Sequence, residues 1–465
     1  MRWSIVSCLI CYAFCAHAQV PYEVLLFGDP ARNNRGSASV VLNDTVWFAG
    51  TISDGMDGSD DIRLHCIAPD GHIIWSKTFG DGRNEYVNNM IRCSDGNLYI
   101  VGDVRNTFTE DLNGFIVAVD TAGTLLWSTD DGDPDLEEDY YNIDCLSDTG
   151  LAVTGFITDT AYSGNDILLA KYALTGAWVS KLVFGDTLND YGMSISCLPG
   201  GNIIISGDRA DVSGTYHAFY AKVLPDNTIA FDVPVTDTYN SGCKNMHLHS
   251  DGTLYLCGES ASALDPQFDV LFARMDTLGN VLALNTIPYP GAEAGYDITS
   301  LPGNRYGITG FGFNPFTVEN DLLFTIVNAE GEELIRNFYG LSGADLGYDI
   351  QSDAEGNVWM SGFIADEDTV WFALVHTGTG TDIHAVATPE HSVQLFPNPV
   401  QDRFRISGTA PIMGVSLIDA YGRYILPGLN NDDGYFCLPK GITPGMYIIA
   451  ITLPDRVVWK KIIAG

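Results

Sequence analysis

Carboxylate side chains are the first candidates for chemistry in this chain. Residues 131–139 read Asp-Gly-Asp-Pro-Asp-Leu-Glu-Glu-Asp, and Asp131, Asp133 and Asp135 alternate along the chain as the oxygen ligands of a calcium loop do. The run lacks the glycine that an EF-hand loop carries at its sixth position. A Ca²⁺ site and a solvated acidic loop between two repeats are therefore both retained as interpretations.

Other polar residues favour structural roles. His247 and His249 lie two apart on a predicted strand and so share one face, but no third zinc ligand is evident. Aspartates open the same segment of four repeats, and this recurrence favours a role in the fold over one in catalysis. No nucleophile elbow, zinc-protease helix or phosphate-binding glycine loop occurs. We therefore predict no catalytic residue and no cofactor other than the possible Ca²⁺. The four aspartates are Asp61, Asp166, Asp269 and Asp321.

A repeated strand must position these side chains. A short apolar segment closed by glycine occurs seven times, with successive glycines 51 to 53 residues apart, a period typical of propeller blades. Each repeat reads as four strands joined by tight turns such as Ser94-Asp95-Gly96 and by one longer loop. The sequence therefore predicts an all-β chain with a seven-bladed β-propeller over residues 19–386. The seven glycines are Gly50, Gly102, Gly155, Gly207, Gly258, Gly310 and Gly362.

The first strand of the mature chain is predicted to close the ring. Phe27-Gly28 lies 52 residues before Phe79-Gly80, the end of a fourth strand, so residues 24–28 read as a fourth strand without its first three. The seventh repeat lacks such an ending. Pairing between the two would remove both free edges of the sheet array. Residues 382–386 are the alternative closing strand.

Charge and the N-terminus limit the function classes. The chain carries 59 acidic residues against 23 Lys and Arg, a net charge of −36, which argues against nucleic acid and anionic membranes as partners. Residues 1–18 combine Arg2, an apolar stretch and Ala16-His17-Ala18, as a secretory signal peptide does. No later segment is long and apolar enough for a transmembrane helix. The charge does not exclude cations, basic partners or neutral polysaccharides as ligands.

The cysteines are interpreted as thiols. Removal of residues 1–18 leaves seven cysteines, so at least one is unpaired. Cys93, Cys145 and Cys197 occupy one column of the repeat, where other repeats have Leu or Ser, and we predict that they are packed free thiols. Cys243 and Cys257 are predicted to lie out of register for a disulfide.

After a linker at residues 387–394 the repeat ends and a different domain begins. Alternating apolar residues between Gly, Pro and Asn turns predict a small β-sandwich over residues 395–465. This segment resembles the type A C-terminal sorting domain of the type IX secretion system, with matching stretches in the family's order. The resemblance implies the type IX machinery and its sortase-like peptidase as partners, and export through the periplasm to the cell surface or medium. The sorting-signal residues it implies are Pro397, Asn398, Pro399, Gly422, Gly445, Tyr447, Lys460 and Lys461.

Together these features predict a non-enzymatic binding or interaction propeller with an unknown glycan or protein ligand. The alternative is a polysaccharide hydrolase or lyase with carboxylates near the central channel. An enzyme should gather non-repeating charged groups at one channel mouth, whereas a binding module should present aromatic or uncharged side chains there. Candidate aromatic residues at the blade entrances are Tyr140, Tyr141, Tyr296 and Tyr348.

Overall fold

The structure is a computed structural model and describes two groups of residues. The first comprises residues 22–29, 32–43, 45–53, 59–105, 112–130, 132, 136–147, 149–159, 164–235, 240–261, 267–289, 291–314, 319–341, 343–353, 356–366 and 369–377. The second comprises 394–396, 400, 403–407, 412, 414–419, 424–426, 429, 431–432, 435–443, 445–452 and 457–464. In these ranges the regular structure is all β, and no helix is long and apolar enough to cross a membrane.

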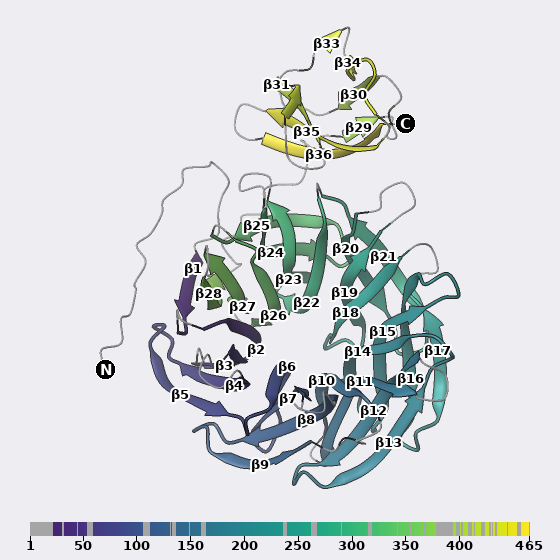
Figure 1. Ribbon diagram of the computed structural model, residues 1–465. Helices are drawn as coiled ribbons and strands as arrows, with labels where there is room; N and C mark the ends of the chain where they lie inside the picture. Colours follow the sequence, from purple (N-terminus) through teal and green to yellow (C-terminus); the bar gives the residue numbers. More distant parts are fainter. Residues whose placement is uncertain are drawn as a thin grey trace.

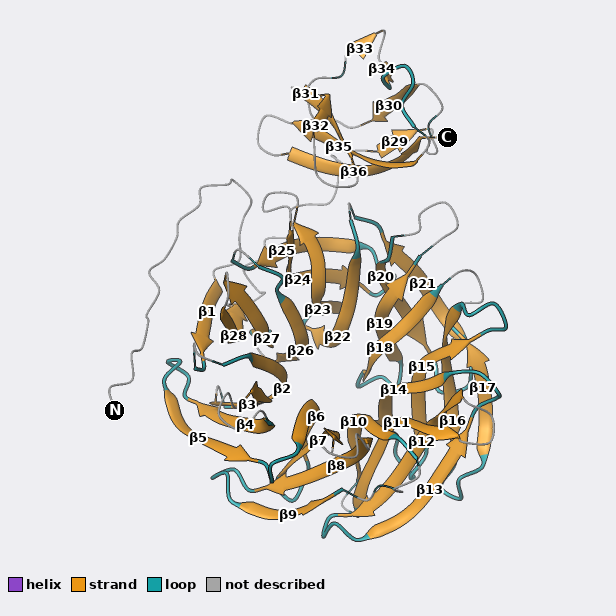
Figure 2. Ribbon diagram, in the orientation of Figure 1, coloured by secondary structure: helices purple, strands orange, loops and turns teal. Residues whose placement is uncertain are grey.

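Seven four-stranded antiparallel sheets are arranged in a ring around a central axis, which confirms the predicted propeller (Figure 1). We call the region around this axis the channel. In blades 1 to 6 the strands follow one another outward in sequence order, and Figure 2 shows the short loops that join them. The innermost strand of each blade contacts those of its two neighbours, so these seven strands line the channel.

The strand bounds repeat with the sequence period. The innermost strands of blades 1 to 7 are β2 (Asn34–Leu42), β6 (Asn84–Arg92), β10 (Glu138–Leu146), β14 (Asp190–Cys197), β18 (Ser241–Leu248), β22 (Glu293–Leu301) and β26 (Leu346–Ser352). The second strands are β3 (Thr45–Ser53), β7 (Leu98–Arg105), β11 (Gly150–Asp159), β15 (Ile203–Ala210), β19 (Leu254–Ser260), β23 (Arg305–Asn314) and β27 (Val358–Asp366). The third strands are β4 (Asp60–Ile67), β8 (Leu112–Val119), β12 (Gly164–Ala173), β16 (Tyr216–Val223), β20 (Asp269–Met275), β24 (Glu319–Asn328) and β28 (Thr369–Thr377). The outer strands of blades 1 to 6 are β5 (Ile73–Phe79), β9 (Leu125–Thr129), β13 (Trp178–Phe184), β17 (Ile229–Pro234), β21 (Val281–Ile287) and β25 (Glu333–Tyr339).

Strand β1 (Tyr22–Phe27) completes blade 7, as the sequence predicts. It pairs antiparallel with β28, and Phe27 lies opposite Phe372. The Phe27 ring also contacts Phe48 and His65 of blade 1, each at 4.9 Å between ring centroids. The N-terminal strand therefore closes the last sheet and packs against the first, so residues 382–386, which lie outside the described residues, are not needed for closure.

The core lies between the blades rather than in one centre. The second and third strands are almost fully buried, because the apolar side chains of one blade pack against those of the next. The outer strands alternate between exposed and half-buried residues. Each pair of adjacent blades thus shares a small core, which lets the chain form a ring of about 350 residues without one large interior.

The predicted free thiols include one error. Cys93, which follows β6, and Cys145 in β10 form a disulfide between blades 2 and 3, with Cα atoms 5.8 Å apart. The common repeat position places these side chains at the same height on neighbouring inner strands, so they face each other across the gap between blades. Cys197 is free, as are Cys243 and Cys257, whose register on β18 and β19 is offset as predicted.

The C-terminal segment forms two four-stranded sheets around its own apolar core. One sheet has the order β29-β30-β34-β33 and the other β32-β31-β35-β36, and Phe404, Leu417 and Ile449 are among the residues buried with them. This arrangement confirms the predicted sandwich. The strands are β29 (Gln394–Phe396), β30 (Arg403–Ser407), β31 (Gly414–Asp419), β32 (Tyr424–Leu426), β33 (Asn431–Asp432), β34 (Tyr435–Cys437), β35 (Gly445–Thr452) and β36 (Val457–Ala464).

Candidate functional site

Every innermost strand contains a β-bulge, and we call the part of the ring's inner face around these seven bulges the channel mouth. In blade 2, for example, Val87 pairs with Gly102 and Asn89 with Val101, so Asn88 has no partner opposite it. Such a bulge re-aims a side chain and frees its position from pairing constraints. One position per blade is thereby available for function. We call these seven the bulge residues: Ser37, Asn88, Tyr141, Met193, Lys244, Tyr296 and Tyr348.

The bulge also explains the repeated glycine. It brings a carbonyl group of the innermost strand onto the second strand, so that a Cβ atom at Gly102 would lie 1.8 Å from the carbonyl oxygen of Tyr86. At Gly310 the corresponding distance to the carbonyl oxygen of Ala294 is 1.9 Å. Only glycine fits beneath the bulge. The bulge in each innermost strand therefore explains why glycine recurs once in every repeat.

Aromatic side chains of blades 6 and 7 gather at this mouth. The rings of Tyr296 and Tyr348 are stacked, with centroids 5.4 Å apart and planes 3° from parallel. Phe311 lies 5.8 Å from Tyr296, and Phe363 lies 6.1 Å from Tyr348. These four residues, all half-buried, are called the first aromatic group.

Blades 3 and 4 carry a second aromatic group, in which Tyr141 is a bulge residue and Phe156 follows a repeat glycine, as Phe311 and Phe363 do. Its rings follow one another from Tyr141 to Phe156 at 5.7 Å, to Tyr191 at 5.6 Å and to Tyr216 at 6.1 Å. The two groups are separated around the ring by blade 5 on one side and by blades 1 and 2 on the other.

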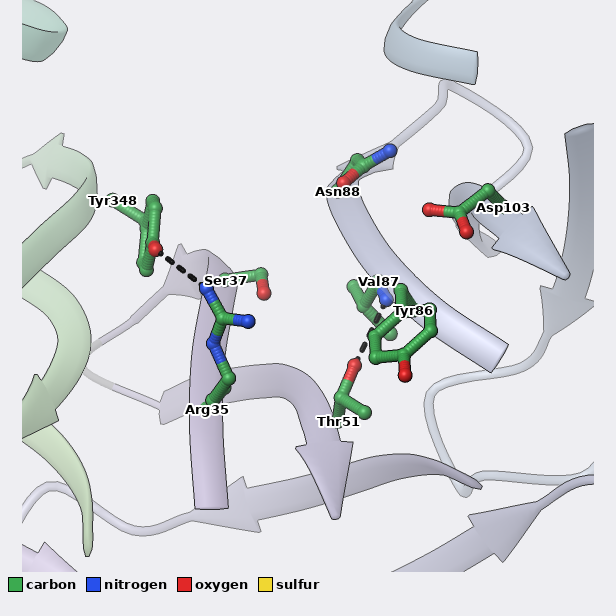
Figure 3. A pocket seen from close by; sticks show the side chains of 8 residues that line it. All are labelled: Arg35, Ser37, Thr51, Tyr86, Val87, Asn88, Asp103 and Tyr348. Atoms are coloured by element: carbon green, nitrogen blue, oxygen red, sulfur yellow. Dashed lines mark hydrogen bonds between the residues drawn. The ribbon is translucent and has the colours of Figure 1, made fainter. Parts of the chain in front are cut away.

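A pocket of about 280 Å³ opens between blades 7, 1 and 2 beside the first aromatic group (Figure 3). Arg35 donates a hydrogen bond to Tyr348 Oη at 3.1 Å, and its guanidinium carbon lies 5.9 Å from the Phe363 ring centroid. Asp103 reaches into the pocket from the opposite wall. The lining residues are Arg35, Ser37, Thr51, Tyr86, Val87, Asn88, Asp103 and Tyr348.

Two neighbouring carboxyl groups have raised pKa values: Asp103, which lines this pocket, and Asp139, which lies behind the lining residue Asn88. Burial raises the pKa of Asp103 to about 6, although the charge of Arg105 opposes the shift. Burial, and then the charge of Asp103, hold the pKa of Asp139 well above its usual range. Asn88 Nδ2 donates a hydrogen bond to Asp139 Oδ1 at 2.9 Å and fixes that carboxyl group. The pair therefore retains a proton at mildly acidic pH.

Blade 5 supplies a different charged group to the mouth. Lys244 Nζ lies 2.9 Å from Glu259 Oε1 and 4.0 Å from Asp208 Oδ2. Burial raises the pKa of Asp208 to about 7 even though Lys244 opposes it. Because this lysine is already paired with two acids, it offers a ligand less free charge than Arg35, which has no carboxylate partner among the described residues.

Below the mouth, polar side chains link neighbouring blades. Asn245 Nδ2 donates to Asp297 Oδ1 at 2.7 Å, and Asp297 Oδ2 accepts the backbone N–H of Ile350 at 2.8 Å. Asp349 accepts the backbone N–H of Ser39 at 3.1 Å, across the junction of blades 7 and 1. These carboxyl groups satisfy backbone donors of the next blade, so their role is to hold the ring together rather than to bind ligand.

Two of the recurring aspartates, Asp61 and Asp166, lie beside the glycine that follows the outer strand of their blade. A Cβ atom at Gly80 would lie 2.2 Å from Asp61 Oδ1, and at Gly185 it would lie 2.3 Å from Asp166 Oδ1. The glycine after the outer strand thus makes room for the aspartate that opens the third strand. His247 lies in the innermost strand β18, burial lowers its pKa to about 4, and the described residues form no metal-ligand cluster around it.

Several predicted site residues cannot be placed. Asp131, Asp133 and Asp135 lie outside the described residues, and next to them Asp130 forms an ion pair with Arg83. Pro397, Asn398, Pro399 and Gly422 also lie outside them. Gly445 lies in β35, Lys460 and Lys461 in β36, and Tyr447 is buried with its hydroxyl group bonded to Thr443. The calcium site and the sorting residues remain predictions.

The four tyrosines singled out in the sequence divide into two kinds. Tyr140 is buried, and its hydroxyl group lies 2.7 Å from that of Tyr172, so it packs between blades. The other three are bulge residues at the mouth. Sequence reasoning missed Arg35, Asn88, Asp103 and Asp139. A signal was present for Asn88, which lies 14 positions before Gly102 in a column where the residue type changes from repeat to repeat.

The fold and the site define a seven-bladed β-propeller with an aromatic and polar channel mouth, joined in sequence to a small β-sandwich. Residues 394–464 match the family described as the secretion system C-terminal sorting domain. This confirms the resemblance to the type IX domain: the protein is one that the type IX secretion system exports to the cell surface or the medium.

Other comparisons add only distant similarity. No curated protein matches the chain. Among solved structures, puromycin hydrolase is 12% identical with a TM-score of 0.48, and the match covers 91% of this chain but 59% of that enzyme. YCF48 bound to D1 peptide is 12% identical with a TM-score of 0.45, covering 80% and 99% of the two chains. The Neurospora crassa Pan2 WD40 domain is 9% identical with a TM-score of 0.47, covering 77% and 96%.

Proposed function

We propose that this exported protein is a glycan-binding propeller whose ligand lies across the channel mouth between the two aromatic groups. The observation that carries the proposal is the stacked pair Tyr296 and Tyr348 beside a pocket in which Val87 is the single aliphatic lining residue. Half-buried aromatic rings offer apolar surface, and phenol, amide and hydroxyl groups beside them offer hydrogen bonds. A sugar ring, with its C–H faces and hydroxyl edges, requires both.

A protein ligand fits this mouth less well. Protein–protein interfaces draw most of their affinity from anchors that fill fully desolvated apolar pockets. The pocket here is lined mainly by polar side chains, and the aromatic rings around it are only partly exposed. The net charge of −36 further disfavours polyanionic ligands and leaves neutral or weakly charged glycans.

A glycan array probed with the intact protein tests the proposal. We expect binding to a limited set of oligosaccharides and its loss, by about tenfold or more, in a Tyr296→Ala/Tyr348→Ala variant. Trp178→Ala is the matched control, because this aromatic side chain is 57% exposed on outer strand β13, away from the channel. Binding to no glycan, combined with specific capture of a protein at the same mouth, would replace the proposal with a protein-binding function.

A second candidate function is hydrolysis of the bound glycan, and the carboxyl pair favours it. A general acid works best when its pKa lies near the operating pH, and Asp103 has a pKa of about 6 and lines the pocket. Asp103 would protonate the leaving oxygen as the glycosidic bond breaks, water would add its hydroxyl group to the anomeric carbon of the new reducing end, and the proton that this water loses would return to the Asp103 carboxylate. Release of reducing ends by the wild type but not by Asp103→Asn would establish it, and binding without release would exclude it.

For export we infer that residues 1–18 direct the chain across the inner membrane and that a sortase-like peptidase removes the sorting domain. The cut is expected between Val386 and Leu395. These boundaries follow from the sequence pattern and from the family to which residues 394–464 are matched. N-terminal and intact-mass analysis of the protein recovered from the medium would locate both processing sites.

A further inference from the structure

Arg35 is one of several cations in this acidic chain that form no ion pair with a described carboxylate. Arg83 and Arg209 each have two acidic partners, whereas Arg63 and Arg92 form no ion pair among the described residues. Arg35 differs from Arg63 and Arg92 in that it lines the pocket. No described carboxylate pairs with Arg35, although it is exposed at the pocket.

The guanidinium group of Arg35 is held in one orientation by neutral groups. One of its nitrogens donates to Tyr348 Oη, and the ring of Phe363 lies beside it. Figure 3 shows the other edge of the guanidinium fork directed toward the middle of the pocket, across from Asp103. The guanidinium group is thus oriented before a ligand binds. Its nitrogen on the pocket side, which is not the one bonded to Tyr348, can donate to a ligand.

The opposite wall does not repel an anion strongly. Asp103 has a pKa of about 6, so near that pH about half of this group is neutral, and the remaining lining residues are uncharged. Two further acids contact the lining, Asp139 through Asn88 and Asp60 through Tyr86, and burial holds the pKa of Asp139 well above its usual range. Acids farther away are screened by salt at physiological strength beyond about 8 Å. A single anionic group in the pocket is therefore attracted, whereas a polyanion that spreads over the acidic surface is repelled.

We propose that the Arg35 pocket selects glycans that carry one carboxylate, such as a single uronic acid on an otherwise neutral chain. A planar carboxylate accepts two parallel hydrogen bonds from the guanidinium fork. The uncharged part of the chain then lies against the first aromatic group. The inference rests on the proposed glycan-binding function and names the substrate class of that site.

The test is an array of matched glycans: each neutral oligosaccharide is paired with versions that bear one glucuronic acid, one sulfate or a uronic acid on every sugar. It is probed with intact wild-type protein and with Arg35→Gln, Arg35→Lys and Arg92→Gln. Arg92 is exposed at the far end of inner strand β6, so its replacement removes the same charge away from the pocket. Unchanged melting temperatures of the variants would show that the comparison concerns binding rather than folding.

We expect the singly uronylated member of each bound pair to bind about 10-fold or more tightly than its neutral partner. Arg35→Gln should abolish that preference while neutral binding persists, Arg35→Lys should retain only part of it, and Arg92→Gln should leave it intact. Equal binding of neutral and uronylated glycans, or a preference that survives Arg35→Gln, overturns the inference but leaves glycan binding standing. Preference for the sulfated or fully uronylated members overturns it too. Binding to no glycan at all refutes the proposed function itself.

Discussion

Replacement of Cys93 and Cys145 by alanine should destabilise the propeller by a calculable amount. The disulfide closes a loop of 52 residues between the inner strands of blades 2 and 3. In the chain-entropy account, a loop of this length lowers the entropy of the unfolded chain by about 14 cal/mol/K, which stabilises the folded state by about 4 kcal/mol at 25 °C. With an unfolding entropy of about 2.1 cal/mol/K per residue over a ring of about 350 residues, the melting temperature should fall by about 5 °C.

The assay is calorimetric unfolding of the intact protein with and without the double substitution. Cys197→Ala is the matched control, because this free thiol occupies the equivalent position on the inner strand of blade 4 and closes no loop. Its melting temperature should stay within about 1–2 °C of the wild type. A double variant as stable as the wild type, or a control destabilised as much as the double variant, would refute the loop-closure reasoning.

Four further results are expected. Deletion of residues 19–28 should lower the melting temperature sharply and promote association, because β1 covers the edge of β28; unchanged thermal stability and a monomeric state would contradict this. Thermal stability should rise as the pH falls from 8 to about 5.5. Burial holds the pKa values of Asp208 and Asp345 near 7, so the stability they contribute is present below their unfolded pKa and is lost as the pH rises through 7; Asp208→Asn should flatten this part of the profile. Below about pH 6.5 this gain should be partly offset, because burial lowers the pKa of His65 to about 3 and its contribution is lost as the pH falls; a His65→Leu variant whose stability changes between pH 6.5 and 4 just as the wild type's does would exclude this group as the cause of the offset. A chain that ends at Thr388 should fold but remain in the periplasm, and cell fractionation that finds it outside the cell would show that the export signal lies elsewhere.

The propeller could be predicted from the repeat because every blade needs a glycine at the same place in its second strand. The spacing of Gly50, Gly102 and their equivalents reports the blade length directly, and Phe27-Gly28 falls in the same register, which identified the closing strand. The physical reason for the glycine was not visible in the sequence. It lies in the bulge of the neighbouring strand, whose carbonyl group occupies the space of a side chain.

The pocket was not predictable, because it joins residues that only ring closure brings together. Tyr348 and Arg35 are separated by almost the whole propeller in sequence, yet they share a hydrogen bond across the junction of blades 7 and 1. The disulfide was missed for a related reason. A repeat column shows that Cys93 and Cys145 are equivalent, but whether equivalent side chains meet depends on the gap between blades.

The central claim is that the channel mouth binds a glycan, and a crystal structure of the intact protein with the tightest-binding oligosaccharide from the array tests it most directly. The account predicts a sugar ring against the first aromatic group, with an adjoining sugar in the pocket beside Arg35 and Asn88. An oligosaccharide bound on the outer strands or on the C-terminal sandwich, with the mouth free of sugar, would contradict it.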